Sequence, residues 1–423
     1  MGSAVRHVRE AENILMGYGF SYVPGTPSTQ FPPGYAFLLA GTFALFGKAY
    51  IAIWLLHISL GVAVVWLTYC LAKTGLTENA SLLAATIVAI YPSFIFDPIT
   101  LVKEIPYTPL FLLAVYWSVR GIDSGSPWHF ALSGLSAGVA TYFRAEIAGF
   151  VVVAALLLVL FRRARWQSIL LLVGLFGIVV FPWTMRNSLI HHRLVFLSTL
   201  GGYNLYVGNN ATTPVLQSWR GESTEAIHRL NVMTGGNEYA QDTVGGQMAL
   251  QFIAGNPAAF VLRGIGKVVD LWGPDRLFFS WYRGGLFAIV MPAVLAIGAA
   301  VISAGGYVVL LLSAVIAAFF SKRRTVLTAL SLALFAYTTA VASIMLGHPR
   351  FHWPLVPFLA ILAAIAITER ATVLRSLFRP RRNLLIAAVL VILVLTVQFV
   401  AVVGAGDLAR TELSAILRTV VIL

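Results

Sequence analysis

Residues 49–72 read AYIAIWLLHISLGVAVVWLTYCLA, and this stretch decides the class of fold. It contains no Asp, Glu, Lys or Arg. At about 1.5 Å of rise per residue, a helix of this length covers the roughly 30 Å hydrocarbon core of a bilayer. Backbone polar groups in lipid must be satisfied within the segment or within a closed barrel. The stretch therefore predicts a membrane-spanning helix.

The composition of the whole chain agrees with this prediction. Of its 423 residues 59% are hydrophobic and only 11% are charged, against roughly 25% charged residues in ordinary soluble domains. This excludes a single soluble globular domain, a disordered chain and a fibrous chain. The one cysteine, Cys70, excludes a scaffold of intramolecular disulfides. We therefore expect an all-α polytopic membrane protein.

The same criterion predicts about ten transmembrane helices, together with interfacial helices and a small extracytoplasmic loop domain. Residues 34–46 are apolar but too short to cross, so we expect an interfacial or re-entrant helix there. For residues 285–320 we favour one crossing plus an interfacial stretch over two crossings that break at Gly305-Gly306. The predicted crossings are 49–72, 80–96, 105–120, 128–143, 146–161, 167–185, 296–320, 325–346, 353–369 and 384–403.

Three basic clusters orient these crossings. The chain has 29 Lys and Arg against 16 Asp and Glu, a net charge of +13. Because the basic residues gather in short loops, we interpret the excess as membrane topology and expect no nucleic acid partner. The clusters that we expect to be cytoplasmic are Arg162, Arg163 and Arg165; Lys322, Arg323 and Arg324; and Arg375, Arg379, Arg381 and Arg382.

This orientation predicts five regions along the chain. An outer-loop part with amphipathic and interfacial helices covers 1–48, and a core of transmembrane helices covers 49–186. An extracytoplasmic loop region covers 187–284. A second set of transmembrane helices covers 285–403, and an extracytoplasmic tail covers 404–423.

Charge is scarce, so the charged residues beside the outer membrane face are candidates for function. Lys103-Glu104 is either a solvated loop pair or a phosphate-binding cation beside a carboxylate that orients a sugar or acts as an acid or base. Arg144 either pairs with Glu146 or binds an anionic group. Arg350 lies between two histidines in the stretch 347–354, which suits an anionic lipid head group.

A further candidate region follows the predicted crossing at 167–185. Arg186-Asn187 ends the stretch FPWTMRN, and residues 198–210 read STLGGYNLYVGNN. Aromatic rings beside amides suit sugars, because rings contact C–H surfaces and amides bond hydroxyls. The alternative is a set of Gly/Asn turns. The candidate residues here are Tyr203, Asn204, Asn209 and Asn210.

Taken together, these motifs resemble one family. The chain looks like a bacterial C-type membrane glycosyltransferase, similar to protein O-mannosyltransferases and to the aminoarabinose transferase of lipid A. The motifs that carry the resemblance are GYGF at 17–20, FPPGYA at 31–36, Glu104, Arg144, PWTMRN at 182–187, GGYNLYVGNN at 201–210 and RFHWPLVP at 350–357.

The resemblance implies a hexosyl- or pentosyltransferase that uses a polyprenyl-phosphate-linked sugar as its donor. It implies an inverting transfer on the extracytoplasmic face of a bacterial inner membrane, to a lipid, glycan or protein acceptor. Basic residues would stabilise the leaving lipid phosphate; the residues for that role are Lys103, Arg144, Arg186 and Arg350, with Glu104 as the catalytic carboxylate. A divalent metal is left open, and no ligand cluster in the sequence demands one.

One departure from the family pattern bears on activity. The resemblance implies a first transmembrane helix and then an outer-loop Asp, the expected general base, just before residues 7–15. Ser3 and Arg6 occupy that neighbourhood. The interpretations are a start codon that lies upstream, or an N-terminally truncated relative with its activity in doubt. Two other functions are kept: a non-catalytic lipid-binding or scaffold relative, and a polysaccharide flippase, polymerase or ligase.

Overall fold

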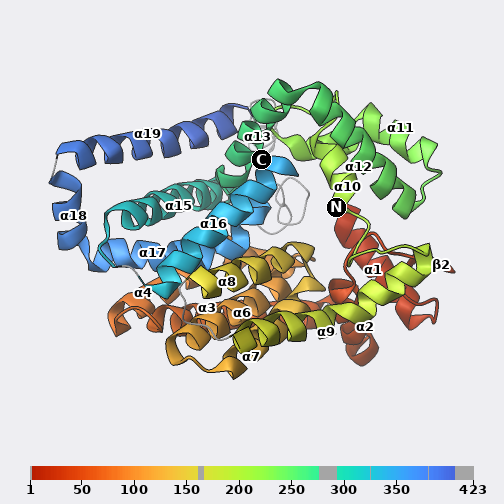
Figure 1. Cartoon of the computed structure of the whole chain (residues 1–423), viewed down its shortest axis with the longest axis horizontal. Helices are drawn as coiled ribbons and strands as arrows, with labels where there is room; N and C mark the ends of the chain where they lie inside the picture. Colours follow the sequence, from red (N-terminus) through yellow and green to blue (C-terminus); the bar gives the residue numbers. More distant parts are fainter. Residues whose placement is uncertain (1, 161–165, 276–292, 324, 380, 405–423) are drawn as a thin grey trace. The chain divides into compact units, whose positions relative to one another are not determined.

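The computed structural model describes residues 2–160, 166–275, 293–323, 325–379 and 381–404, and these are almost entirely helical (Figure 1). The described strands are β1 (Ser21–Val23) and β2 (Thr26–Pro27), which pair antiparallel. The described residues confirm the prediction of an all-α polytopic membrane protein. They form two compact units, each described by itself. The first comprises 1–74, 98–206 and 225–251, and the second 75–97, 207–224 and 252–423.

The first unit is built around a layer of long helices. Neighbours in this layer pack in the order α3, α6, α7 and α9, while α1 packs on α2 (Figure 1). Its helices are α1 (Gly2–Leu15), α2 (Gly34–Phe46), α3 (Tyr50–Lys73), α6 (Glu104–Ser124), α7 (Pro127–Thr141), η2 (Ala145–Ile147), α8 (Ala148–Leu160), α9 (Trp166–His191), α10 (Gly201–Gly208), α11 (Glu225–Met233) and α12 (Glu238–Gly255).

Small residues let α7 approach its neighbours closely. A Cβ on Gly134 would lie 2.3 Å from the carbonyl oxygen of Leu172 on α9, so this position admits only glycine without a shift of the backbone. On the side of α6, the hydroxyls of Ser118 and Ser133 lie 2.8 Å apart. Close backbone approach and hydrogen bonds between helices are how membrane helices associate, because lipid removes the hydrophobic drive between them.

The second unit centres on α17, which is buried over most of its length. It packs against α4 and α15, while α13 packs on α16 and α15 on α19 (Figure 1). The helices of this unit are α4 (Glu78–Ala89), α5 (Pro92–Phe96), η1 (Asp97–Ile99), η3 (Ser218–Ser223), α13 (Pro257–Trp272), α15 (Ala293–Phe320), α16 (Val326–Ile344), η4 (Pro349–Leu355), α17 (Val356–Thr368), α18 (Arg370–Phe378) and α19 (Arg381–Val403).

Six described helices are long and apolar enough to cross a membrane, or eight spans if two bent pairs each count as one. The six coincide with the predicted crossings at 49–72, 167–185, 296–320, 325–346, 353–369 and 384–403. The predicted crossing at 80–96 falls on one bent pair, α4 with α5, which bends by 58°. The predictions at 105–120, 128–143 and 146–161 fall on α6, α7 and α8. These three are not among the helices that are long and apolar enough to cross a membrane.

Two local predictions can be compared with the helices directly. The apolar segment 34–46 forms α2 with those bounds, and its place in the membrane stays a prediction. Gly305-Gly306 does not break α15, which runs unbroken from Ala293 to Phe320. Of the predicted basic clusters, Arg162, Arg163, Arg165 and Arg324 lie outside the described residues, as do residues 405–423 of the predicted tail.

Candidate functional site

The first unit brings Lys103, Glu104 and Arg144 together at one end of its helix layer. Glu104 begins α6, and Lys103 precedes it. Arg144 stands in extended backbone after the end of α7, just before η2. The Nη1 atom of Arg144 donates to Oε1 of Glu104 over 3.1 Å, and both side chains are almost fully buried, at 5% and 1% exposure. Residues 40 positions apart therefore share one buried ion pair.

Arg144 also binds a second carboxylate. Its Nη2 atom donates to Oε1 of Glu146 over 2.7 Å. The side chain of Glu146 is 44% exposed. Partial desolvation raises its pKa, but the charge and hydrogen bonds of Arg144, with Lys103 nearby, outweigh this and hold the pKa at about 2. Glu146 is therefore ionised at neutral pH. The predicted pair of Arg144 with Glu146 is present, and Arg144 is shared with Glu104. Binding of an anionic head group or phosphate by Arg144 stays a prediction.

The FPPGY loop supplies the wall of this cluster. The ring of Phe31 lies 5.5 Å from Nζ of Lys103 and 5.0 Å from the guanidinium carbon of Arg6. Tyr107, one turn along α6, has its ring 5.7 Å from the guanidinium of Arg144. Cations over aromatic faces are stabilised most where water is excluded. Phe31 and Tyr107 thus place aromatic rings beside Arg6, Lys103 and Arg144.

Arg186 and Asn187 lie on α9 and bind the backbone of the first unit. Arg186 donates from Nη1 to the carbonyl of Ser28 over 3.0 Å and stacks on Trp183 with its guanidinium 4.4 Å from the ring. Asn187 is fully buried and donates to the carbonyl of Leu197 over 2.9 Å. These contacts hold the loop before α2 and the turn after α9. A role for either residue in substrate binding stays a prediction.

Glu238, which the sequence did not single out, anchors the same loop. It begins α12 and accepts the backbone N–H groups of Thr29 over 2.7 Å and of Gln30 over 2.9 Å. It also pairs with Arg6. A carboxylate accepting several N–H groups fixes a loop strongly, since such charge-assisted bonds are about twice as strong as neutral ones. The signal available in the sequence was an acidic residue at a helix start.

The GGYNLYVG motif forms α10. Asp242 of α12 accepts the backbone N–H of Gly202 over 2.6 Å and of Tyr203 over 3.3 Å, which caps the start of this helix. Tyr203 is buried, and Asn204 continues the helix through its N–H bond to Leu200. The motif is therefore a helix in contact with α12, where the sequence left open a set of turns.

In the second unit, Asn209 binds a buried lysine, Lys267. Nζ of Lys267 is fully buried and donates to Oδ1 of Asn209 and to the carbonyl of Ile344, both over 2.9 Å. Asn210 accepts the N–H of Thr212 over 2.9 Å and so closes a turn. Lys267 escaped the sequence analysis, because a single lysine in an amphipathic segment is more often at the surface.

Arg350 also belongs to the second unit. It lies in η4, where its backbone N–H donates to Nδ1 of His348 over 3.0 Å. The neighbouring His352 is fully buried; its Nδ1 lies 2.6 Å from the carbonyl of Leu271, and its ring stacks on Tyr307. Asn209, Asn210 and Arg350 are thus placed within their own unit, and their grouping with Lys103, Glu104 and Arg144 stays a prediction.

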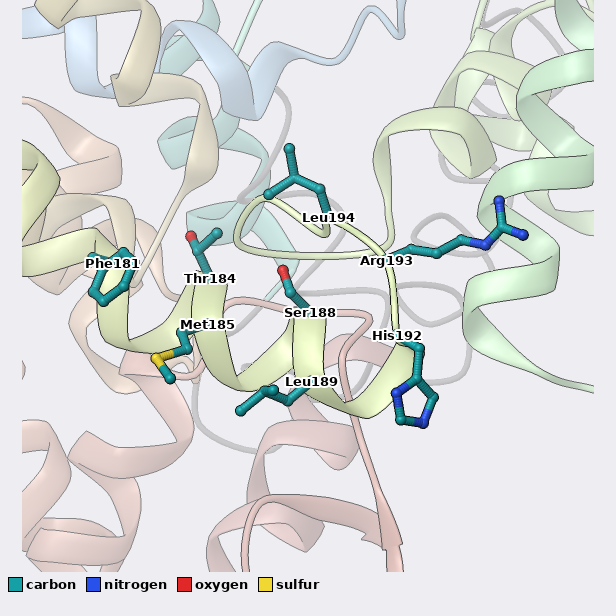
Figure 2. Close-up of a pocket in the computed structure, with 8 residues that line it drawn as sticks. All are labelled: Phe181, Thr184, Met185, Ser188, Leu189, His192, Arg193 and Leu194. Carbon is teal, nitrogen blue, oxygen red and sulfur yellow. The ribbon is translucent and has the colours of Figure 1, made fainter.

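A cavity of about 420 Å³ lies beside the C-terminal end of α9 (Figure 2). Thr184 and Ser188 point from the helix toward the segment that carries Leu194, and Arg193 extends away from the helix (Figure 2). The hydroxyl oxygen of Thr184 is buried and has no hydrogen-bond partner among the described residues. The lining residues are Phe181, Thr184, Met185, Ser188, Leu189, His192, Arg193 and Leu194. This cavity is a largely apolar groove with cationic or titratable groups at one end.

The described residues contain no group of three or more His, Cys, Asp or Glu side chains placed to hold a metal ion. The candidate site is therefore defined by its ion pairs and aromatic rings.

Comparisons with known proteins agree with this architecture. Residues 30–185 match the family described as dolichyl-phosphate-mannose-protein mannosyltransferase. The apo oligosaccharyltransferase of Archaeoglobus fulgidus is similar over 91% of this chain and 50% of its own, with 14% identity and a TM-score of 0.51. The oligosaccharyltransferase AglB of that organism, with an inhibitory peptide and a dolichol-phosphate, is similar over 97% and 51%, again with 14% identity and a TM-score of 0.51. No curated protein sequence matches the chain.

The chain is a polytopic membrane protein whose fold is similar to that of the archaeal oligosaccharyltransferases. The family match over residues 30–185 agrees with the resemblance found in its sequence. The segment 30–185, which contains the FPPGY loop, Glu104 and Arg144, carries the similarity to the mannosyltransferase family. The chain spans about half the length of the archaeal structures that it resembles.

Proposed function

We propose that this protein transfers a sugar from a polyprenyl-phosphate donor to an acceptor hydroxyl at the extracytoplasmic face of a bacterial inner membrane. The observation that carries the proposal is the buried ion pair of Glu104 and Arg144, with Lys103 next to it in the chain. Ionised groups are costly to bury, and they are retained together where a function requires them. The family match over 30–185 supports the same activity class, and the archaeal relative that holds a dolichol-phosphate supports a lipid-linked donor.

The chemistry needs cations where the phosphate leaves. When the bond between the sugar and the phosphate oxygen breaks, negative charge collects on the lipid phosphate. Lys103 supplies a point charge, and Arg144 supplies fixed donors that match phosphate oxygens. Both are already placed by Glu104, Glu146 and Phe31, so little reorganisation is needed during the reaction. Glu104 would contact a hydroxyl of the donor sugar, because a carboxylate accepts such hydrogen bonds well.

The lipid tail of the donor needs an apolar surface. The groove at the end of α9 offers Phe181, Met185, Leu189 and Leu194, all strongly exposed in the protein alone. Exposed apolar side chains at the end of a membrane-spanning helix are normally covered by lipid. We assign this groove to part of the isoprenoid chain, and Arg193 at its end to electrostatic attraction of anionic lipid.

The direct test uses purified protein in nanodiscs with radiolabelled polyprenyl phosphates that carry mannose, glucose or aminoarabinose, plus bacterial membrane extract as acceptor. We expect consumption of at least one donor and release of polyprenyl phosphate. Glu104→Ala and Arg144→Ala should each lower the rate by about 100-fold, since each removes a group that acts on the transition state. Arg229→Ala is the matched control, because Arg229 pairs with Glu225 at an exposed position.

Two results would remove the proposal. The first is a wild-type protein that consumes none of the donors. The second is a pair of folded Glu104→Ala and Arg144→Ala variants with wild-type rates, since the buried ion pair would then be purely structural. Arg350→Ala tests separately whether the second unit contributes to the reaction.

A further inference from the structure

A buried histidine faces the candidate site and was not used in the proposed function. His7 lies on α1 and is 2% exposed. Its ring contacts the rings of Phe31 and Tyr35 edge-on, with centroids 5.5 Å apart in each pair. Its two nitrogens have different surroundings. Nδ1 lies 3.2 Å from Oε2 of Glu10, while Nε2 is buried and has no hydrogen-bond partner among the described residues.

The carboxylate of Glu10 sets the orientation of the ring. Glu10 is fully buried and receives a second contact from Arg6, whose Nε donates to Oε1 over 2.9 Å. Because an ionised carboxylate can only accept, the hydrogen bond requires the proton of the imidazole to sit on Nδ1. That tautomer leaves the lone pair of Nε2 available. A base held in one tautomer by a carboxylate is the arrangement that general-base catalysis uses.

The electrostatic surroundings keep the ring neutral. Burial lowers the pKa of His7 below 6.5, Lys103 and Arg6 lower it further, and the hydrogen bond and charge of Glu10 raise it in part. The titratable groups that face the ring are Arg6 and Glu10 from α1, Tyr35 from α2 and Lys103 from the start of α6. A histidine that is neutral at pH 7 is ready to accept a proton.

His7 also lies beside the residues assigned to the leaving group. The ring of Phe31 contacts the ring of His7, and Nζ of Lys103 lies 5.5 Å from the centre of the same Phe31 ring. Tyr35, in contact with His7, is close enough to Glu104 for that carboxylate to raise its pKa, after the larger effect of burial. The base candidate and the cationic cluster therefore share two aromatic neighbours within the first unit.

We propose that His7, positioned by Glu10, is the general base for the acceptor. The inference rests on the proposed function and adds the group that activates the nucleophile. Nε2 takes the proton of the acceptor hydroxyl while the oxygen of that hydroxyl forms a bond to the anomeric carbon of the sugar. The bond from this carbon to the phosphate oxygen breaks, and its electron pair leaves with the polyprenyl phosphate. Lys103 and Arg144 stabilise that anion, and the His7 imidazolium is stabilised by Glu10.

Glu104 is less suited than His7 to act as the base. Glu104 is paired with Arg144, and an arginine neighbour makes a carboxylate a weaker base. Within the described part of the chain, no cation is bonded to Nε2 of His7. The neutral ring can take up a proton at pH 7 and release it to water after transfer.

The test compares His7→Asn with wild-type protein in the nanodisc assay described above, over pH 5 to 9. Asn can still donate to Glu10 but cannot act as a base. We expect the rate of His7→Asn to fall by about 100-fold or more. The rate of the wild type should fall at acid pH with a pKa below 6.5, and this acid limb should disappear in the variant. Imidazole should restore part of the activity of His7→Ala. His228→Asn, on the exposed face of α11, is the matched control.

Glu10→Gln tests the positioning role. An amide no longer stabilises the imidazolium, so the acid limb should move to lower pH and the rate should fall less than in His7→Asn. A merely structural role for Glu10 would leave the pKa of the acid limb unchanged. The wild-type pH profile needs no variant at all, so the inference stays testable even where a variant folds poorly.

The outcomes separate the inference from the proposed function. Donor turnover in the wild type with an unchanged rate in folded His7→Asn would overturn the base and leave the glycosyltransferase activity standing. A wild-type rate without an acid limb at any pH at which the protein stays folded would also overturn it. A wild type that turns over none of the donors removes the activity, and the base with it.

Discussion

Arg144 and Glu104 form an ion pair over 3.1 Å in which neither side chain is more than 5% exposed. The two residues come from different helices, since Glu104 begins α6 and Arg144 follows α7. Breaking a buried pair leaves one charge without its partner, which typically costs about 3–5 kcal/mol. The pair should therefore matter for folding as well as for chemistry.

Arg144→Lys should lower both thermal stability and activity. A lysine supplies one point charge, so it cannot bind Glu104 and Glu146 at once as the guanidinium does. We expect a loss of roughly 1–3 kcal/mol, measured by thermal unfolding in detergent. The exposed pair of Arg229 and Glu225 provides the comparison, and Arg229→Lys should change stability by less than about 0.5 kcal/mol. Equal effects at the two sites would contradict the assigned burial.

Two adjacent glycines of α10 should respond oppositely to alanine. A Cβ on Gly202 would lie 2.0 Å from the carbonyl oxygen of Asp242, whereas one on Gly201 would meet nothing within 4 Å. Gly202→Ala should therefore separate α10 from α12 and destabilise the protein by about 1–3 kcal/mol. Gly201→Ala should be neutral or slightly stabilising, because alanine favours helix. Thermal unfolding of the two variants measures the difference, and equal unfolding temperatures would argue against this helix contact.

Glu238→Gln should loosen the loop that precedes α2. The glutamine retains one acceptor oxygen but loses the charge that binds Arg6 and the N–H groups of Thr29 and Gln30. We expect a loss of roughly 1–3 kcal/mol and faster hydrogen exchange at residues 28–30, read by mass spectrometry. Glu225→Gln, on the exposed face of α11, should leave exchange in that loop unchanged. Unaltered protection of the loop in Glu238→Gln would exclude the anchoring role.

The stability of the protein should depend on the protonation of His7. Burial, the largest cause, lowers the pKa of His7 in the folded state below the value of 6.5. Below that pH the unfolded chain binds a proton that the folded protein does not, so the free energy of unfolding falls as the pH drops. The stability contributed by the neutral His7 ring is fully present above pH 6.5 and is lost as the pH falls through the folded pKa of His7. His7→Asn should remove this part of the pH dependence in unfolding curves between pH 5 and 7.5; identical slopes would show that His7 titrates normally.

The groove beside α9 should affect donor binding more than chemistry. Leu194 is 83% exposed in the protein alone, and covering such a side chain with an isoprenoid chain contributes about 1.5–3 kcal/mol. Leu194→Asn should therefore raise KM for the lipid donor by about tenfold with little change in kcat. Leu250→Asn on α12 removes an exposed leucine outside the groove and should leave KM unchanged. A drop in kcat with an unchanged KM would show that the groove acts in a step other than donor binding.

Much of the fold was predictable because lipid imposes a simple rule. Six of the predicted crossings coincide with helices long and apolar enough to span, since an uncharged run of sufficient length has few alternatives in a membrane. The shorter runs that became α6, α7 and α8 were recognised as apolar, but their lengths alone do not decide whether they cross. Local apolarity predicts that a helix forms, and packing between helices decides where it lies.

The candidate site was predictable only in part. Lys103, Glu104 and Arg144 stand out because charges near the membrane are few, and the structure brings these three together. His7 and Glu10 lie three residues apart on one face of α1, a spacing visible in the sequence. What marks them is burial against Phe31 and Tyr35, and that depends on how α1 packs on α2. Arg186 was a candidate from the sequence, and only the structure shows that its guanidinium binds the carbonyl of Ser28.

The sequence by itself determined the membrane class of this protein, most of its long helices and the family motifs, because these depend on runs of apolar side chains and on residue types at short spacing. Only the tertiary structure decided which charges are paired, which nitrogen of His7 is left available and which backbone Glu238 holds. The physical reason is that burial and hydrogen-bond distance are set by residues far apart in the chain. Glu238 and Thr29 are separated by 209 positions, yet the backbone N–H of Thr29 donates to Oε2 of Glu238 over 2.7 Å.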